Sequence, residues 1–500
     1  MCYNEITTST YDTPAVSPKD ERFTDETRFS PLVEALKYHG HQTLDLPLDS
    51  LDIAFNYLNQ RILTTVKPMR HNIGILSVMQ GIDGLPLLPG YESLEMDTSE
   101  GFPLINSRPK NVHNKSWLFI RKLTSDGYVT TSVHPLLEKL IHDNMTKRYS
   151  RIVPETIFTD CLKDAKLPKE KCLAPGKVRV FSTSPIEYTI AVRRFFMDFS
   201  AAYQSTRFAI GSAIGVDMTG LEVDYMVKLM KEKSNIYITG DYSKFGPTLN
   251  LQCVLRAFDI MINWYNKHGK PDPLSSMVRR ILAYESAQSM HLALNLVYTV
   301  INGSPSGSPL TVIINDLVNK LYLYTAWIEL NKKFNTGLTI QDYSLHATEL
   351  TYGDDLWVNI SHKVKDVFNN ETLSEFFSEF KIKFTDAVKS GRMIPYSKLT
   401  DETCSFLKRT FHIHDKYSNV YVARLEERSL LETCNWRWNT SHDAIEGTRL
   451  ACLAMLENAY QYGEEYYNNL LERTLDWFVE KSIPFNAPSY KEMTLRIYKF

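Results

Sequence analysis

The sequence predicts an α+β fold, with a compact mixed region at about residues 236–410 and a mainly helical part after it. Three observations support this fold class. The run NIYIT at 235–239 is short, apolar and rich in β-branched and aromatic residues, as in a buried strand. Residues 344–360, SLHATELTYGDDLWVNI, place two stretches of strand character around a tight Gly-Asp turn, which predicts a hairpin. Beyond about residue 415, the apolar residues recur mostly with helical spacing.

The remaining elements follow in order along the chain. The first 110 residues are rich in loops. Helical spacing covers 131–150, 187–204, 248–267, 309–333 and 361–380, and a short strand pair is expected at 288–301. Between 161 and 195, eight Lys and Arg stand against three Asp and Glu, so this segment is locally basic.

The composition is that of an ordinary globular chain. Of 500 residues, 43% are hydrophobic and 23% are charged, which excludes a disordered or fibrous protein. At roughly 150 residues per domain, there is room for about three domain-sized units. The formal net charge is −2, so any nucleic-acid site has to be a local basic channel on a near-neutral body.

Two further classes are disfavoured by the sequence. The apolar stretches end well short of the roughly 18 residues that a membrane span needs, so no transmembrane segment is expected. The N-terminus lacks a basic-then-apolar signal region. The seven cysteines are scattered without a C-x-x-C pair, which predicts reduced thiols and supports no structural zinc site.

Aspartates mark the ends of the predicted strands in the mixed region. Asp354 and Asp355 occupy the hairpin turn, and Asp241 follows the NIYIT strand. Two Mg²⁺ ions about 3.5–4 Å apart require bridging carboxylates from separate elements, and this arrangement supplies them. From these residues alone, a plain surface turn and an ordinary strand-end aspartate remain the alternatives.

A Gly- and Ser-rich loop lies between these carboxylates in sequence. It runs SGSPLT from Ser306 to Thr311, and Asn315 follows one helical turn later. Thr311 and Asn315 share a face near a helix N-terminus, where a hydroxyl and an amide can read the hydroxyls of a sugar. A capped helix after a turn is the alternative. A serine-hydrolase elbow and a P-loop are excluded, because Pro305 stands at the nucleophile position and Gly176-Lys177 lacks the flanking pattern.

Taken in order, these motifs resemble the RNA-dependent RNA polymerases of positive-strand picornavirus-like viruses (Picornavirales), of insect iflavirus or dicistrovirus type. The similarity spans roughly residues 98–410. Its segments are 98–103 (template entry), 163–179 (a basic finger motif), 211–215, 241–245 (motif A), 306–315 (motif B), 352–355 (motif C), 385–390 (motif D) and 406–409 (motif E). Each segment is weak alone, but eight of them in the family's order are specific.

The resemblance implies a right-hand polymerase fold of fingers, palm and thumb, in which the palm carries an antiparallel sheet packed on helices. The implied boundaries are fingers at 1–190, palm at 191–262, a fingers insertion at 263–302, palm at 303–413 and a helical thumb at 414–500. It implies template-directed RNA synthesis from nucleoside triphosphates on an RNA primer, with two Mg²⁺ ions that Mn²⁺ can replace. It also implies a small viral protein primer, other viral replication proteins as partners, and membrane-associated replication complexes in the host cytoplasm.

Matching positions carry the expected site. The resemblance implies that Asp241, Asp354 and Asp355 are catalytic metal ligands and that Lys389 donates a proton to the pyrophosphate. The implied nucleotide-binding residues are Lys163, Lys177, Arg179, Ser306, Gly307, Thr311 and Asn315, and the implied RNA-binding residues are Thr98, Ser99, Lys408 and Arg409. The basic segment 161–195 is expected beside the triphosphate.

One position departs from the family pattern. Motif A usually has a second Asp five residues after the first, which helps to recognise the ribose 2′-OH, and residue 246 is Gly instead. A Gly before Pro247 is expected to hold backbone angles that Asp tolerates poorly.

Two other functions stay open. A reverse transcriptase also has an Asp-Asp hairpin, but the basic finger motif, the SGxxxTxxxN pattern and the Gly before the Asp pair favour an RNA product. A catalytically inert RNA-binding protein on the same fold is opposed by the three intact aspartates.

Overall fold

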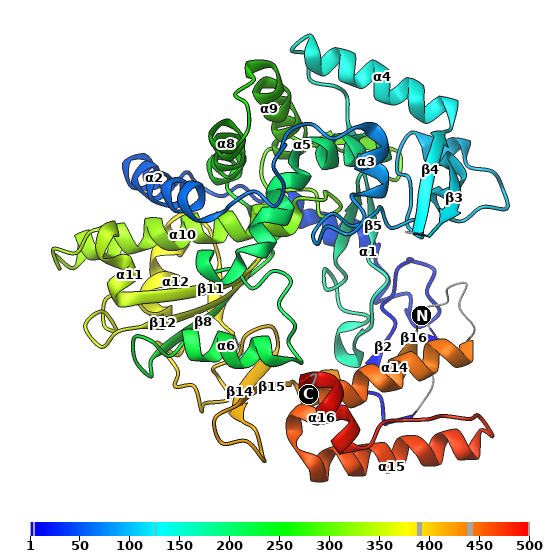
Figure 1. Ribbon diagram of the computed structural model, residues 1–500, viewed down its shortest axis with the longest axis vertical. Coiled ribbons are helices and arrows are strands. Elements are labelled where there is room, and N and C mark those ends of the chain that lie inside the picture. The colour runs from blue at the N-terminus through cyan, green and yellow to red at the C-terminus, as the bar shows by residue number, and fades with distance from the viewer. Residues whose placement is uncertain (1, 4–5, 126, 388–392, 438–443, 499–500) are drawn as a thin grey trace.

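One four-stranded antiparallel sheet, the palm sheet, carries the predicted catalytic strands (Figure 1). The computed structural model describes residues 2–3, 6–125, 127–387, 393–437 and 444–498. The strand order in the palm sheet is β11–β12–β8–β13. These strands are β8 (Tyr237–Tyr242), β11 (Ala347–Tyr352), β12 (Asp355–Ile360) and β13 (Phe384–Asp386).

Helices and further strands surround this sheet. The α-helices are α1 (Pro31–Leu36), α2 (Leu48–Thr65), α3 (Val78–Asp83), α4 (Pro135–Tyr149), α5 (Ile186–Ser205), α6 (Leu221–Leu229), α7 (Phe245–Thr248), α8 (Leu251–His268), α9 (Pro273–Ala287), α10 (Thr311–Lys333), α11 (Tyr343–His346), α12 (Asn370–Glu379), α13 (Glu427–Leu431), α14 (Ala444–Ala459), α15 (Glu464–Glu480) and α16 (Tyr490–Tyr498). The other strands are β1 (Cys2–Tyr3), β2 (Tyr11–Asp12), β3 (Phe119–Thr124), β4 (Gly127–Val133), β5 (Ile157–Leu162), β6 (Leu167–Pro168), β7 (Val180–Thr183), β9 (Met290–Ala293), β10 (Leu296–Thr299), β14 (Arg409–Ile413), β15 (Tyr421–Leu425) and β16 (Trp436–Arg437).

The two faces of the palm sheet pack against different elements, because side chains alternate along each strand. Ile238 and Tyr242 of β8 join the largest hydrophobic core, together with α10 and α12. Tyr237 of β8 and Trp357 of β12 join a second core with α6 and the β14–β15 hairpin. Both faces are therefore covered, and Asp241 near the end of β8 stays half-buried.

A second four-stranded sheet, the finger sheet, has the order β10–β9–β5–β7. In it, β5 pairs parallel with β9 and antiparallel with β7. Helix α5 packs against α3, α4, α8 and α9, and its buried apolar side chains extend the largest core toward this sheet. The finger sheet is thus joined to the palm sheet by one continuous hydrophobic core.

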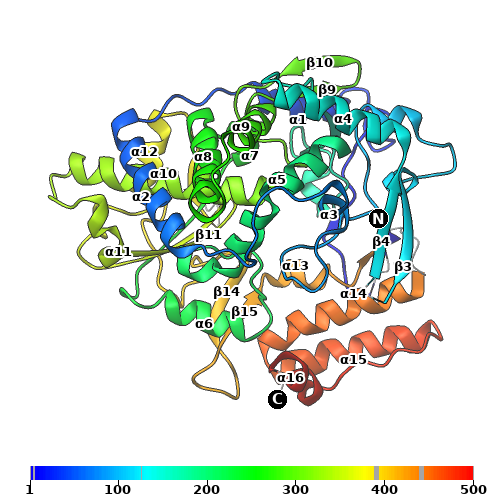
Figure 2. The same ribbon diagram turned by 45° about the horizontal axis from the view of Figure 1, so that its top comes forward.

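The C-terminal helices α14, α15 and α16 form a separate core with α13. Figures 1 and 2 both show these helices at one end of the molecule, with the N-terminal strands beside α14. Strand β1 pairs with β16, and Ile6 is buried in this C-terminal core. The first residues therefore contact two parts of the chain, because β1 and Ile6 pack with the C-terminal part, whereas β2 pairs with β6 inside the predicted fingers segment 1–190.

Most predicted elements are confirmed, with two differences. The predicted helices at 131–150, 187–204, 248–267 and 309–333 are α4, α5, α8 and α10, and the strand pair at 288–301 is β9 and β10. In the stretch 361–380, the helix begins only at Asn370, because the Asn369 side chain accepts from the backbone N–H groups of Glu371 and Thr372. The first 110 residues also contain α2, an 18-residue helix that packs on α10. In the part of the chain that the structure describes, no helix has the length and apolar character for a membrane span.

Candidate active site

The turn between β11 and β12 carries the aspartate pair. Tyr352 pairs with Asp355, so Gly353 and Asp354 are the two turn residues. Gly353 has a φ of +60°, which suits the first central position of a type II′ hairpin turn. This short turn fixes the register of the hairpin, and with it the position of both carboxylates at the rim of the palm sheet.

The register of β8 brings the third aspartate to the same place. The last pair between β8 and β12 joins Gly240 to Leu356. Asp241 lies one residue beyond this pair, and Asp355 immediately precedes Leu356, so the two aspartates stand on adjacent strands at the same level. Asp241, Asp354 and Asp355 are all half-buried. The structure therefore brings together the three predicted metal ligands at one edge of the sheet.

A buried asparagine holds the hairpin against β8. Asn319 of α10 donates from Nδ2 to the carbonyl oxygens of Gly353 (3.0 Å) and Asp355 (3.4 Å). Its Oδ1 accepts from the Tyr242 hydroxyl at 3.3 Å. Burial, together with the negative charge of Asp354, raises the pKa of Tyr242, so this hydroxyl stays protonated and able to donate. Asn319 thus links the aspartate turn to the residue that follows Asp241.

A buried ionic network joins β11 to the helices α2 and α10. The Lys320 ammonium donates to the Gly211 carbonyl at 2.6 Å and lies 3.4 Å from Asp316. Glu349 of β11 pairs with Arg61 of α2 at 2.5 Å. Although burial opposes it, the positive charges of Arg61 and Lys320 lower the pKa of Glu349. Removing one member would leave an uncompensated buried charge, so this network fixes the hairpin strand to α2 and α10.

The loop 303–308, which follows β10 and precedes α10, docks on motif A. Gly303 donates to the Leu249 carbonyl at 2.9 Å, and Ser304 donates to the Gly246 carbonyl at 3.1 Å. Gly303 has a φ of +88°, and a Cβ there would lie 2.7 Å from the Gly246 oxygen. Only glycine allows this backbone conformation and this approach.

The expectation that Gly246 holds backbone angles unsuited to Asp stays a prediction, because this residue lies in α7 directly before Pro247, where helical angles are disfavoured for a residue with a Cβ. The φ of Gly246 lies outside the left-handed region, and a Cβ at this position would meet no atom within 4 Å. The space that a larger side chain needs at position 246 is therefore available.

The predicted sugar-reading residues differ in what they already contact. The Thr311 hydroxyl lies within hydrogen-bonding distance of the Pro305 (3.0 Å) and Ser308 (2.8 Å) carbonyls, so its donor is used to close the loop. The Asn315 Oδ1 atom is buried and has no hydrogen-bond partner among the described residues. A Cβ on Gly353 would lie 3.7 Å from the Asn315 Cβ, so Asn315 is next to the aspartate turn. Of these two side chains, Asn315 has the acceptor that a ligand can satisfy.

Three predicted nucleotide-binding cations gather on the finger sheet. Lys163, Lys177 and Arg179 are exposed, and the Lys163 amide donates to the Arg179 carbonyl at 2.8 Å across the β5–β7 ladder. Lys244 lies beside them, where its ammonium donates to the Gly176 carbonyl at 2.9 Å. Burial and the positive charges of Arg179 and Lys177 lower the pKa of Lys244. Such a cluster of like charges favours a polyanionic ligand.

Lys244 was not among the predicted site residues, although it lies in the motif A segment 241–245. Its ammonium also lies 4.0 Å from the centroid of the Tyr38 ring, a contact with a segment 206 residues earlier that no local pattern indicates. Its place three residues after Asp241 was the available signal.

The basic segment 161–195 does not act as one surface, which corrects the expectation that its whole charge lies beside the triphosphate. Lys166 donates to the Glu432 carbonyl at 2.7 Å. Arg193 donates to the Gly81 carbonyl at 2.6 Å, and Arg194 donates to the Leu76 carbonyl at 2.9 Å. These three side chains hold parts of the protein together because buried carbonyls need donors.

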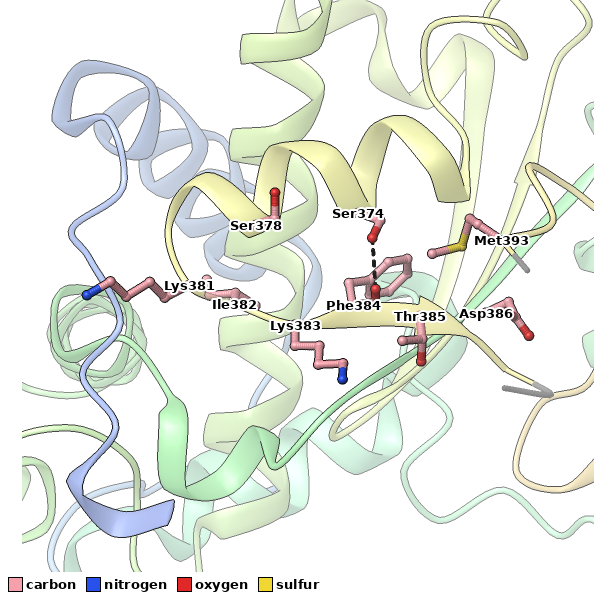
Figure 3. Close-up of a pocket in the computed structure, with 9 residues that line it drawn as sticks. All are labelled: Ser374, Ser378, Lys381, Ile382, Lys383, Phe384, Thr385, Asp386 and Met393. Carbon is pink, nitrogen blue, oxygen red and sulfur yellow. Dashed lines mark hydrogen bonds between the residues drawn. The ribbon is translucent and has the colours of Figure 1, made fainter. Parts of the chain in front are cut away.

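The edge strand β13 ties motif D to motif A. Thr385 pairs with Asp241 in the sheet and donates from its hydroxyl to the Asp241 carbonyl at 3.3 Å. A pocket with a volume of about 570 Å³ lies against this strand (Figure 3), and the Ser374 hydroxyl of α12 donates there to the Phe384 carbonyl at 2.9 Å. The predicted proton donor, Lys389, lies outside the described residues, three positions after the end of β13. The described start of motif D, at Thr385, is thus fixed beside Asp241.

The predicted RNA-binding residues differ in their exposure and in their contacts. Thr98 is exposed, and the half-buried Ser99 accepts from Arg108 at 3.2 Å. Lys408 is exposed next to β14, whereas the Arg409 guanidinium donates to the Ala423 carbonyl (2.8 Å) and to Asn458 (2.6 Å). The exposed Lys408 ammonium lies 3.7 Å from Glu426 and donates to the Ser429 hydroxyl at 3.3 Å, and Arg409 mainly joins β14 to β15 and α14.

The family-model comparison decides the assignment of this site. The model for "Viral RNA-dependent RNA polymerase" matches residues 4–479. The chain belongs to this polymerase family. The right-hand fold is confirmed by the Sicinivirus 3Dpol RNA dependent RNA polymerase structure, which has a TM-score of 0.76 and 20% sequence identity, over 98% of this chain and 93% of that one.

Sequence relatives of the polymerase confirm the predicted subgroup. The chain is 34% identical to the genome polyprotein of Deformed wing virus over 492 residues, which is 97% of this chain and 16% of the polyprotein. It is 28% identical to the replicase polyprotein of Drosophila C virus over 477 residues, which is 91% of this chain and 26% of that protein. The polymerase thus spans a minor part of these relatives' length.

Proposed function

We propose that the polymerase extends an RNA primer on an RNA template with a two-metal site formed by Asp241, Asp354 and Asp355. The observation that carries this proposal is the meeting of three half-buried aspartates at the end of β8 and the β11–β12 turn. Carboxylate oxygens are the ligands that Mg²⁺ prefers, and Mn²⁺ accepts the same ligands, so the donor set fits both ions. When bound, such ions activate the attacking hydroxyl and stabilise the charge on the leaving pyrophosphate.

The chain's own residues complete the nucleotide site in this proposal. Lys163, Lys177, Arg179 and Lys244 attract the triphosphate and orient it toward the aspartates. Ser306, Gly307, Thr311 and Asn315 contact the ribose, and the buried Asn315 Oδ1 supplies an acceptor for a sugar hydroxyl. Lys389 donates a proton to the leaving pyrophosphate as a general acid.

The remaining assignments follow from the family. We propose that Thr98 and Ser99 contact the template, and that Lys408 and Arg409 contact the primer strand. We propose the fingers, palm and thumb boundaries as given above, with the addition that Ile6, Thr7 and Thr10 bond to Asn435 and Glu432 of the thumb. A small viral protein primer, other viral replication proteins and membrane-associated complexes in the host cytoplasm complete the proposed setting.

Primer extension tests the proposal. The purified protein should extend a defined RNA primer–template in Mg²⁺ or Mn²⁺ and should prefer ribonucleotides to deoxynucleotides; the opposite preference would support a reverse transcriptase. Asp354→Ala and Asp241→Ala should each lower the elongation rate by at least about 10³-fold, because charge stabilisation at the reacting phosphate is lost.

A surface carboxylate provides the matched control. Asp366 is an exposed palm residue, and Asp366→Ala should leave the rate unchanged. If Asp354→Ala keeps more than about a tenth of the rate, the barrier has changed by less than about 1.4 kcal/mol and the metal-ligand assignment is wrong. A protein that binds RNA but extends no primer in either ion would support the inert RNA-binding alternative.

A further inference from the structure

A cluster of histidine and acidic side chains lies away from the aspartates, in the finger sheet. Its members are His39, which follows α1, Asp160 of β5 and His291 of β9, and their ligand-type atoms lie within 4.8 Å of one another. Tyr298 of β10 joins them, because its hydroxyl donates to Asp160 Oδ2 at 2.5 Å. The residue types match those of transition-metal sites.

The atoms of this cluster are already satisfied by protein groups. Asp160 Oδ1 accepts from the Ser182 hydroxyl at 2.6 Å and lies 2.9 Å from His291 Nδ1. The other ring nitrogen of His291 lies 2.8 Å from the Ser289 hydroxyl. The side chain of Asp160 is fully buried, and that of His291 is 4% exposed. A buried carboxylate with three donors is a complete hydrogen-bond network, so the geometry favours a structural role over metal binding.

One member of the network, Ser182, also contacts the loop of the predicted nucleotide site. The backbone N–H of Ser182 donates to the Ser306 hydroxyl at 3.1 Å, and the Gly307 amide donates to the Ser182 carbonyl at 3.0 Å. A Cβ at Gly307 would lie 2.3 Å from the Ser182 oxygen, so loop and strand are in close contact. Ser182 therefore contacts Asp160 with its side chain and the motif B loop with its backbone.

We propose that Asp160 is a positioning residue of the nucleotide site: through Ser182 it holds β7 against the loop 303–308. This inference rests on the proposed function, in which Ser306 and Gly307 contact the ribose. The loop has few other attachments of its own, namely the bonds of Gly303 and Ser304 to the backbone of 246–249 and the Thr311 bonds. Asp160 and Ser182 are also paired in the β5–β7 ladder, so losing their side-chain bond leaves the strand in place but loosens Ser182 locally, together with the loop that its backbone holds.

The substitution Ser182→Ala tests this link with little other change. It leaves Asp160 with its contacts to His291 and Tyr298, and it leaves the two backbone bonds to the loop in place. Thr159→Val is the matched control: Thr159 is the neighbour of Asp160 on β5, and its buried hydroxyl has no hydrogen-bond partner among the described residues. Asp160→Asn is the second test variant, because an amide cannot accept all three hydrogen bonds.

Hydrogen exchange of the loop amides, measured without nucleotide, gives a readout that does not depend on polymerase activity. In Ser182→Ala and Asp160→Asn, exchange at residues 303–308 should become about 5- to 30-fold faster, the factor expected for losing a buried hydrogen bond. Single-nucleotide kinetics should show weaker nucleotide binding and roughly 3- to 10-fold lower preference for ribo- over deoxynucleotides, with little change in the rate at saturating nucleotide. Thr159→Val should match the parent in all three.

Two results would overturn the inference. One is loop exchange in folded Ser182→Ala protein that equals that of Thr159→Val. The other is a rise in melting temperature on adding Zn²⁺ that His291→Gln abolishes, which would make the cluster a metal site. If the parent protein incorporates no nucleotide, the proposed function fails, whereas the exchange comparison still decides the positioning role.

Discussion

Replacing Asn319 by leucine should lower both the free energy of unfolding and the elongation rate. The contacts of Asn319 allow the size of both effects to be estimated. Asn319 is fully buried, and its three contacts are one good hydrogen bond of 3.0 Å and two long ones of 3.3 and 3.4 Å. A leucine of similar size leaves the Gly353 carbonyl and the Tyr242 hydroxyl buried without this partner. At about 1–3 kcal/mol for each unsatisfied group, and less for the long contacts, the free energy of unfolding should fall by about 2–3 kcal/mol.

The catalytic effect of Asn319→Leu comes from the loosened turn. A displacement of catalytic groups by about 1 Å costs on the order of 10²-fold in rate, so we expect elongation at saturating nucleotide to fall by roughly 10- to 100-fold. Asn331→Leu is the matched control, since Asn331 is a buried asparagine on the same helix that bonds to the Trp327 carbonyl at 2.8 Å. It should lose stability but keep its rate.

The assays are urea unfolding and single-nucleotide incorporation on a preassembled RNA primer–template, at a temperature where both variants are folded. If Asn319→Leu loses as much stability as Asn331→Leu but keeps its rate within about threefold of the parent, Asn319 does not position the aspartate turn.

Four further substitutions test individual roles by single-nucleotide kinetics. Asn315→Ala should lower the preference for ribo- over deoxynucleotides by roughly 5- to 100-fold, because an acceptor for the sugar is lost; equal discrimination would place sugar reading elsewhere. Lys244→Met should weaken nucleotide binding about 10-fold at nearly constant maximal rate, whereas Lys228→Met, on the exposed face of α6, should not. For Gly246→Asp we expect lower stability and no gain in ribonucleotide preference, because helical angles directly before Pro247 are disfavoured for a residue with a Cβ, although a Cβ there meets nothing within 4 Å; unchanged stability would contradict this. Lys389→Ala should lower the maximal rate by about 10²- to 10⁴-fold, and an effect on nucleotide binding alone would refute the general-acid role.

The palm was predictable because its signals are local. The strand at β8, the two-residue turn and the long helix α10 each follow from short patterns of apolar and turn residues. Their chain order then carried the family resemblance. Asp241, Asp354 and Asp355 could therefore be named together before their proximity was known.

The parts that were missed depend on contacts between distant segments. Asn319 and Lys320 lie in a helix whose neighbours are apolar, and their partners on the strands, the Asp355 carbonyl of β12 and the Thr351 hydroxyl of β11, are fixed only by the sheet register. A polar residue at a buried helical position was the available signal, but it does not identify its partner. Likewise, Lys163 and Arg193 are both cations of the same basic segment, and the sequence does not distinguish their roles. Only the fold shows that Lys163 is exposed, whereas Arg193 donates to the Gly81 carbonyl.

The short N-terminal segment at residues 6–12 restricts how the C-terminal helices can move. Ile6 and Thr7 donate to Asn435 at 2.9 and 2.8 Å, and Thr10 donates to Glu432 at 2.6 Å, so one end is fastened to the C-terminal core. The other end, β2, pairs with β6, which lies between the cations of the finger sheet in sequence. These seven residues thus join the C-terminal core to β6, beside the direct contacts of Lys166 with Glu432 and of Arg428 with Glu170. A movement of the C-terminal helices relative to the segment that carries Lys163 and Arg179 would therefore have to break several of these bonds together.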